Sequence, residues 1–245
     1  MDPKNTYSTA IPCFMADWKR ELKPVAFFDL AQQMAMIGGS YCGFGENDLK
    51  KFGIVWVLAR MEVKFLKPVL RDDVVTINTW HRGQEGLFFN RDYEMLNEAG
   101  ERVAVGTSAW IFMNFETRRA VRGDRVDGLD TGNPQCTDRV LPEDAHKVVF
   151  PRGVEPELIG SHTVRNSDVD VNRHANNAKY VEWIMNYLPD ELVYNSRVSS
   201  ICINYNKEAR PGETVDLLHV ETEGVHYVEG KVGDDLIFTS SIEFE

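Results

Sequence analysis

The strongest constraint on the fold is that one order of segment types occurs twice along the 245 residues. A strand pattern, a helix pattern rich in apolar residues and a run of strand patterns appear in the first half and again in the second. Residues 61–67 lie over 201–207 at an offset of 140 (201 minus 61), and without a gap 71–75 lie over 211–215. Each pair aligns a strand, a turn and a second strand. We therefore expect two halves of one design.

In the first half we expect one buried helix beside an antiparallel meander. Apolar and β-branched residues over 7–15 favour a first strand. Lys23-Pro24 then leads into a helix that is apolar on most sides, and Gly38-Gly39 should end or kink it. Turns are expected at Gly83 and over 97–100, and strands over 54–66, 74–80, 87–96 and 102–113.

In the second half, a strand over 159–164 should precede a helix with one apolar stripe, formed by Tyr180, Val181, Ile184, Met185 and Leu188. Strands follow over 198–206, 214–220, 225–232 and 236–244. The composition between the halves, rich in Arg, Asp, Gly and Pro, is typical of a surface connection with room for a short helix. The expected organisation is an N-terminal half over 1–115, a connecting segment over 116–158 and a C-terminal half over 159–245.

The charge balance limits the partners. The chain has 27 Lys and Arg against 38 Asp and Glu, and a net charge of -11 argues against nucleic acid as a partner. Its one dense basic run reads most simply as a solvated loop, and consists of Arg118, Arg119, Arg122 and Arg125.

Cysteine spacing and the N-terminus bear on the compartment. Cys13, Cys42, Cys136 and Cys202 show neither a metal-knuckle spacing nor a disulfide pattern, which fits a reducing environment. The first residues have no secretory or transit pattern, and no apolar run approaches the length of a membrane span. We expect a cytoplasmic protein without a membrane partner.

A polar cluster before the second helix is the candidate catalytic stretch. It consists of Asp168, Asp170, Asn172, His174 and Asn176. Asp and Asn before a helix are usually caps, so each residue alone has a structural explanation. In an extended loop, however, Asp170, Asn172 and His174 would alternate and project towards one side, and a cap needs only one of them. The entry to the first helix, over 22–29, contains neither His nor Asn, so such a site would be the single one in the chain.

These residues carry a family resemblance. Asp168-Val-Asp-Val-Asn-Arg-His-Ala-Asn-Asn-Ala-Lys-Tyr-Val-Glu-Trp183 resembles the Asp-Leu-Asp-Val-Asn-Gln-His-Val-Asn-Asn-(Val)-Lys-Tyr signature of acyl-acyl carrier protein (acyl-ACP) thioesterases, the plant plastid enzymes and their bacterial relatives. Trp56-Val-Leu-Ala-Arg-Met61 is similar to another run of that family. The resemblance extends from about Tyr7 to the end, and further similar blocks are Asp73-Val-Val, Thr79-Trp80, Trp110, Met113-Asn114 and Thr117-Arg118-Arg119.

The resemblance implies an α+β fold of two hot-dog units, each a long helix wrapped by an antiparallel sheet, with the two sheets joined side by side. It implies hydrolysis of a fatty acyl thioester on acyl carrier protein, an acidic protein with a pantetheine arm, without a metal or organic cofactor. The family's catalytic residues map onto Asp170, Asn172, His174 and, after the next strand, Glu208. Where the family often has Cys after that acid, this chain has Ala209, which leaves water as the nucleophile.

Roles follow from the chemistry of a thioester. Asp170 or Glu208 would deprotonate a water, Asn172 would hold the water or the carbonyl, and His174 would orient a carboxylate or help the thiolate depart. Backbone N–H groups near Asn176 and Asn177 would stabilise the oxyanion, and Asp168 is expected as a turn or cap residue. Acyl-chain candidates, which core packing also explains, are Phe27, Met34, Ile37, Trp56, Arg60 and Met61; carrier-binding candidates are Arg118, Arg119 and Arg122.

Two alternatives stay open. One is an acyl-CoA thioesterase of the same fold, and the other is a non-catalytic binder of acyl chains or carrier protein, although a binder has no need of the four polar residues. A hot-dog dehydratase is disfavoured because its motifs do not match. The preferred chain length, and the choice between a monomer and a homodimer, stay open as well.

Overall fold

The computed structural model describes residues 4–129 and 135–245. It divides into two compact units, Met1–Ala145 and His146–Glu245. Residues 130–134 of the expected connecting segment lie outside the described residues. No helix in the described ranges is both long enough and apolar enough to cross a membrane.

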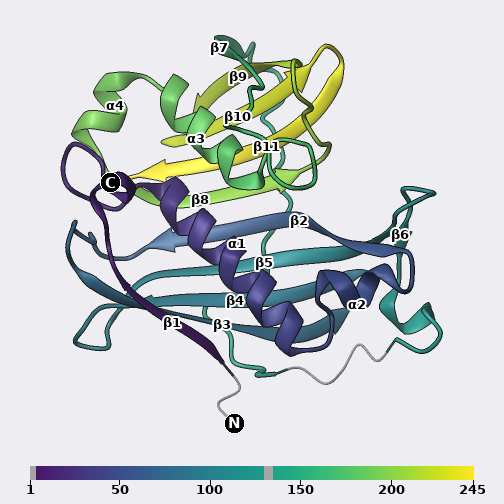
Figure 1. Ribbon diagram of the computed structural model, residues 1–245. Helices are drawn as coiled ribbons and strands as arrows, with labels where there is room; N and C mark the ends of the chain where they lie inside the picture. The colour runs from purple at the N-terminus through teal and green to yellow at the C-terminus, as the bar shows by residue number, and fades with distance from the viewer. Residues whose placement is uncertain (1–3, 130–134) are drawn as a thin grey trace. The chain divides into compact units, whose positions relative to one another are not determined.

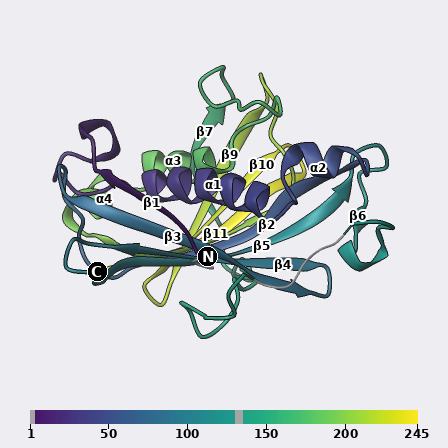
Figure 2. The same cartoon turned by 60° about the horizontal axis from the view of Figure 1, so that its bottom comes forward.

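The first unit is an antiparallel sheet with one long helix, α1 (Pro24–Tyr41), lying across it (Figures 1 and 2). The strand order is β1 (Asn5–Ala10), β3 (Val74–Glu85), β4 (Phe88–Leu96), β5 (Arg102–Asn114) and β2 (Ile54–Phe65), and β6 (Ala120–Val121) pairs with β5. Short helices are η1 (Cys13–Met15), α2 (Glu46–Lys50) and η2 (Gly123–Arg125). The buried helix and the antiparallel meander are thus confirmed.

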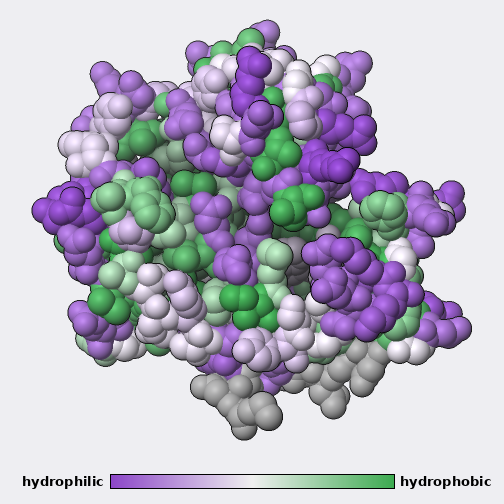
Figure 3. Space-filling view, in the orientation of Figure 1, coloured by the Kyte–Doolittle hydropathy of each residue, from purple (hydrophilic) through white to green (hydrophobic). Residues whose placement is uncertain are grey.

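Helix α1 does not end at Gly38-Gly39 as the sequence predicted. It begins at Pro24, a residue suited to a first helical turn, and continues through both glycines to Tyr41. A Cβ on Gly38 would lie 2.6 Å from the guanidinium Nη1 of the buried Arg91, so the glycine allows close packing and not a helix end. The solvent side of the helix exposes Met36 and Tyr41. Figure 3 shows hydrophobic residues interspersed with hydrophilic ones on this face of the molecule.

Two further expectations for the first unit are corrected. The first strand ends at Ala10, because Pro12 is followed by the 3₁₀ turn of η1. Gly83 does not form a turn but lies inside β3, where its positive φ of 111° accompanies a shift of strand register. The turn itself falls at Gly86, φ 62°, three residues later.

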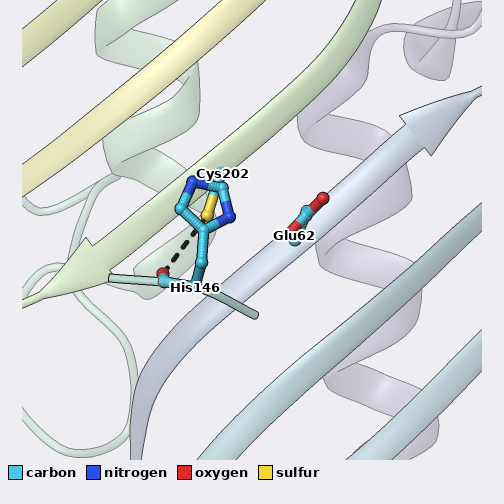
Figure 4. A group of neighbouring side chains, drawn as sticks. All are labelled: Glu62, His146 and Cys202. Carbon is cyan, nitrogen blue, oxygen red and sulfur yellow. Dashed lines mark hydrogen bonds between the residues drawn. The ribbon is translucent and has the colours of Figure 1, made fainter. Parts of the chain in front are cut away.

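The second unit repeats the arrangement. Its sheet has the order β8 (Val198–Tyr205), β11 (Asp235–Phe244), β10 (Val225–Val232), β9 (Thr214–Thr222) and β7 (Glu157–Thr163), all antiparallel. Helix α3 (Asn177–Tyr187) packs on it through Tyr180, whose ring stacks on Phe238 at 5.3 Å, and α4 (Asp190–Asn195) follows. Cys202 is buried in β8, and its thiol donates to the carbonyl of His146 at 3.6 Å (Figure 4). The α+β class with two helix-wrapped antiparallel sheets is confirmed.

The repeat extends to individual backbone hydrogen bonds. The N–H groups of Leu66 and Lys67 both donate to one carbonyl in β5, at 2.8 and 3.1 Å, and their counterparts Asn206 and Lys207 donate to one carbonyl in β11 at the same distances. The offset between the pairs is 140 (206 minus 66). The gap-free alignment inferred from the sequence therefore joins structurally equivalent positions.

Candidate active site

The candidate catalytic stretch forms a short hairpin between β7 and α3. Val169 and Ala175 are bridged as in an antiparallel pair, and the N–H of Asp170 donates to the carbonyl of His174 at 3.0 Å. Arg173 closes the turn with a positive φ of 69°. The stretch is not the extended loop that the sequence analysis assumed, so alternation does not decide where the side chains point.

The turn holds Asp170 and Asn172 together. Asn172 donates its backbone N–H to Asp170 Oδ1 at 2.8 Å and its side-chain amide to Oδ2 at 3.3 Å. Asp170 is half-buried and Asn172 is exposed. The amide of Asn172 therefore fixes the direction of the Asp170 carboxylate.

His174 and Glu208 meet from different segments. The His174 Nε2 and Glu208 Oε2 atoms are 3.4 Å apart, and both side chains are about three-quarters buried, with 26% and 28% exposed. The N–H of Ala175 donates to the carbonyl of Ala209 at 2.9 Å, which ties the hairpin to the segment after β8. The structure thus brings all four sequence-predicted polar residues to one hairpin and the segment bound to it.

Tyr180 is a residue of this site that the sequence analysis missed, because it lies in the apolar stripe of α3. Its phenol oxygen accepts the N–H of Ala209 at 3.0 Å. Burial, reinforced by the Glu208 and Asp170 carboxylates, raises the pKa of Tyr180 to about 12, so the phenol is neutral at physiological pH. The available signal was the hydroxyl itself, since a buried tyrosine needs a hydrogen-bond partner.

We expect Tyr180→Phe to fold but to lose stability and turnover. The corresponding residue of the first unit is Phe27, so the ring alone suits this packing position. The buried N–H of Ala209 would lose its acceptor, which costs roughly 1–3 kcal/mol and loosens the position of Glu208. Urea denaturation would show the loss of stability, and unchanged stability together with unchanged kcat would contradict a positioning role.

Asp168 does more than the expected turn residue. Its Oδ2 accepts the N–H of Arg165 at 2.7 Å and lies 2.9 Å from Nε2 of His162, whose ring stacks on Trp183 at 4.4 Å. Burial would raise the pKa of Asp168, but the hydrogen bonds from His162 and Arg165 outweigh it and lower that pKa below its usual value. The carbonyl of Asp168 also accepts the N–H of Asn176 at 2.8 Å, so this residue anchors both ends of the hairpin.

The lowered pKa of Asp168 predicts an acid-dependent stability. A carboxyl group whose folded-state pKa lies below its unfolded value stabilises the fold above the unfolded pKa, and this contribution disappears as pH falls through the folded pKa. Asp168→Asn should therefore lose roughly 1.5–3 kcal/mol at pH 7, and the gap between parent and variant should narrow below about pH 4. Denaturant titrations at pH 7 and below about pH 4 measure the difference in unfolding free energy between parent and variant. A difference that does not change with pH would contradict an ionised Asp168.

The start of α3 corrects the expected oxyanion donors. The Asn176 side chain caps the helix by accepting the N–H of Ala178 at 2.9 Å, while its own N–H is taken up by Asp168. Lys179 donates its N–H to the Asn176 carbonyl at 2.9 Å. Asn176 is thus a cap residue whose backbone N–H is already engaged, and of the two expected backbone donors only Asn177 remains a candidate.

The acyl-chain candidates all lie in the first unit, in packed surroundings. Phe27, Met34 and Met61 are almost fully buried, whereas Ile37 is 36% exposed. Trp56 donates its indole N–H to the carbonyl of Phe44 at 2.9 Å within a cluster of aromatic rings, and the guanidinium of Arg60 lies 5.0 Å from the ring of Phe88.

The carrier-binding candidates Arg118, Arg119 and Arg122 are exposed in the first unit. Arg122 is engaged by its neighbour Asp124, to which it donates from Nε at 3.0 Å and from Nη2 at 2.7 Å. Its charge is therefore partly compensated within the loop.

The first unit contains the same hairpin without the catalytic side chains. Ala16 and Leu22 form the bridge, the N–H of Asp17 donates to the carbonyl of Glu21 at 2.8 Å, and Arg20 has a φ of 67°. The offset to the second hairpin is 153 (170 minus 17). In the first unit the counterparts of Asp168, Asn172, His174 and Glu208 are Met15, Lys19, Glu21 and Pro68, so only the second unit assembles the polar site.

Fold and site together place the chain among proteins built from two helix-wrapped antiparallel sheets, with one polar site in the second. Comparison with family models finds the acyl-ACP thioesterase N-terminal domain over residues 4–124 and the acyl-ACP thioesterase C-terminal domain over 154–238. The chain belongs to the acyl-ACP thioesterase family.

Individual relatives agree with this. The chain is 30% identical to the chloroplastic oleoyl-acyl carrier protein thioesterase 1 of Arabidopsis thaliana over 79% of this chain and 56% of that protein. It is 33% identical to the chloroplastic palmitoyl-acyl carrier protein thioesterase of Gossypium hirsutum over 68% of this chain and 41% of that protein. The chain thus spans about half the length of the curated relatives it matches.

Solved structures share the fold over its whole length. An acyl-ACP thioesterase from Bacteroides thetaiotaomicron superposes with a TM-score of 0.89 at 23% identity, covering 99% of this chain and 98% of that one. The 12:0-ACP thioesterase from Umbellularia californica gives 0.82 at 22% identity, covering 99% and 97%. These likenesses establish the two-unit hot-dog fold.

Proposed function

We propose that the protein hydrolyses the thioester of a fatty acyl chain on acyl carrier protein and releases the free fatty acid. The observation that carries this proposal is the contact of His174 with Glu208, 3.4 Å apart, beside the Asp170–Asn172 pair. The equivalent hairpin of the first unit keeps the backbone but has Glu21 and Pro68 in place of His174 and Glu208. Membership of the family and the names of the relatives support the same reaction.

The geometry favours Glu208 as the group that takes the proton of the attacking water. Both oxygens of Asp170 already accept from Asn172, whereas Oε2 of Glu208 faces Nε2 of His174. Water oxygen would attack the thioester carbon while Glu208 accepts its proton, a role worth roughly 10²–10⁴-fold in rate. Asp170, held by Asn172, would orient the water and the imidazole.

Collapse of the tetrahedral intermediate breaks the carbon–sulfur bond. His174, in contact with Glu208, would pass the proton to the departing thiolate of the pantetheine arm, so that a free thiol and a carboxylic acid leave. The N–H of Asn177, in the first turn of α3, would stabilise the oxyanion together with the positive end of the helix dipole. The fully buried Ala209 directly after Glu208 supports water, and not a cysteine thiol, as the nucleophile at this position.

The candidates for acyl-chain contact in the first unit have a second explanation. Phe27, Met34 and Met61 are almost fully buried apolar side chains, and Trp56 packs against a hydrophobic core cluster, so core packing explains each of them as well as contact with an acyl chain does.

Free thiol release from a set of acyl-ACP substrates of graded length, with the matching acyl-CoAs alongside, tests the proposal. We expect a higher kcat/KM for the carrier-bound substrates, and the set then gives the preferred chain length. Faster cleavage of the acyl-CoAs would support thioester hydrolysis but would make acyl-CoA, and not acyl-ACP, the preferred substrate. Binding of acyl-ACP without cleavage of any thioester would make the protein a binding module.

A further inference from the structure

Three exposed arginines lie in or next to the segments that form the candidate active site of the second unit. They are Arg165, Arg173 and Arg210. Arg165 precedes the hairpin and its carbonyl accepts the N–H of Asp168 at 3.0 Å, while Arg173 occupies the turn itself. Arg210 lies two residues after Glu208, and its N–H donates to Glu213 at 2.7 Å. The three side chains therefore leave the backbone from the segments that carry the catalytic residues.

The acidic side chains of the site are more deeply buried than the arginines next to it. Asp168 is buried, and Asp170 and Glu208 are half-buried, so the acids face inward. The guanidinium groups of the three arginines are exposed, and none makes an ion pair with any residue of the described ranges. Arg165, Arg173 and Arg210, called the arginine rim below, are thus exposed positive charges next to the candidate active site of a chain whose net charge is -11.

The first unit provides an internal comparison. At the equivalent positions of its hairpin and following segment, Pro12 replaces Arg165 and Leu70 replaces Arg210. The counterpart of Arg173 is Arg20, whose Nη2 lies 3.9 Å from the Asp72 carboxylate, where the second unit has Gly212. Because the two hairpins share their backbone, folding alone does not require the three unpaired charges, and they occur only in the unit with the catalytic residues.

We infer that Arg165, Arg173 and Arg210 form the surface on which the acidic face of acyl carrier protein docks. This inference rests on the proposed function and adds the partner's position. The negative carrier meets the arginine rim, whose three guanidinium groups pair with no carboxylate of the described residues, and the pantetheine arm then enters between them at the hairpin. Such rim charges act mainly on the rate of encounter and on specificity. This surface is distinct from the basic run of Arg118, Arg119 and Arg122 in the first unit, of which Arg122 is paired with Asp124.

The test compares the parent with the triple variant Arg165→Gln, Arg173→Gln, Arg210→Gln. The readout is the ratio of kcat/KM for acyl-ACP to kcat/KM for the same acyl group on N-acetylcysteamine, a thioester without carrier or phosphate. We expect this ratio to fall roughly 10- to 100-fold at low ionic strength, mostly through KM, and the salt dependence of the acyl-ACP reaction to flatten. Arg152→Gln, an exposed arginine of the same unit outside the three segments, should leave the ratio unchanged.

Three outcomes would overturn the inference. The first is an unchanged ratio in a folded triple variant. The second is an equal loss with acyl-CoA, which would mean recognition of the phosphates on the arm and not of the carrier protein. The third is a larger loss for Arg118→Gln, Arg119→Gln, Arg122→Gln, which would place the carrier on the first unit.

Direct binding separates this inference from the proposed function. The anisotropy of fluorescently labelled holo-carrier protein is measured with the parent and the triple variant. We expect the Kd to rise about tenfold or more in the variant, and this comparison requires no turnover. If no thioester is cleaved but the Kd rises as expected, the proposed reaction is wrong and the docking surface is supported. If the Kd values of parent and variant are equal, the docking surface is wrong, whatever the reaction.

Discussion

Substitution of His174 by alanine is expected to lower kcat on acyl-ACP by roughly 10²–10⁴-fold while the protein stays folded. The imidazole is 3.4 Å from Glu208, and its loss removes both the partner of that carboxylate and the proton donor to the thiolate. The backbone of His174 supplies the hydrogen bond of the hairpin, so the fold does not depend on the ring. Single-turnover thiol release measures the chemical step directly.

Glu21→Ala is the matched control for this variant, because Glu21 holds the same place in the hairpin of the first unit. Activity of Glu21→Ala should equal that of the parent. Asp170→Asn and Glu208→Ala should resemble His174→Ala, with the larger loss for Glu208→Ala if Glu208 is the base. A His174→Ala variant that retains more than about a tenth of the parent kcat would contradict the assignment.

Substitution of Asp92 by asparagine is expected to have the largest effect on stability. Asp92 is 1% exposed, and its Oδ1 accepts from Nε of Arg82 at 2.7 Å and from Thr107 at 2.8 Å. Its Oδ2 accepts the N–H of Val140 at 2.9 Å, which fastens the segment after β6 to the first sheet. Asp92→Asn removes one of the two carboxylates that pair with the buried Arg82 and leaves Asp144 as its partner. We therefore expect a loss of about 3 kcal/mol, at the lower end of what breaking a buried ion pair costs.

The exposed pair of Glu101 and Lys67 is the control for Asp92→Asn. The two side chains are joined at 2.9 Å in solvent, where an ion pair contributes little, so Glu101→Ala should leave the unfolding midpoint almost unchanged. Urea denaturation of both variants compares the two environments. Similar midpoints for Asp92→Asn and Glu101→Ala would mean that the buried network is dispensable.

The sequence predicted the elements of the fold well, because each half repeats the same hydrophobic periods and the repeat can be checked by a constant offset. It failed where a glycine has a role in packing. Gly38 and Gly83 read as helix end and turn, whereas the structure uses the first to admit Arg91 beneath α1 and the second to shift the register of β3. The sequence shows where a glycine allows unusual backbone angles or close packing. It does not show which neighbouring residue in the fold requires the glycine.

For the candidate site, the sequence predicted the residues but not their arrangement. Asp170, Asn172 and His174 were expected to alternate in an extended loop, yet Arg173 with its positive φ turns the loop into a hairpin. Tyr180 and the pairing of Asp168 with His162 were missed, because both depend on contacts between segments that follow no short-range pattern. The degree of burial also depends on the tertiary structure. It distinguishes the exposed arginines near the site from its buried and half-buried acids, and the sequence did not predict it.

The two hairpins have a consequence for how such a chain changes over time. In an assembly of two identical subunits, one gene encodes both hairpins, so a substitution that benefits one necessarily appears in the other. Here the hairpin around Asp17 is encoded separately from the one around Asp170, and selection on hydrolysis acts on the second alone. Residues 17–20, at the turn of the first hairpin, are therefore a natural position for randomised libraries or an inserted peptide, since the reacting groups are encoded elsewhere.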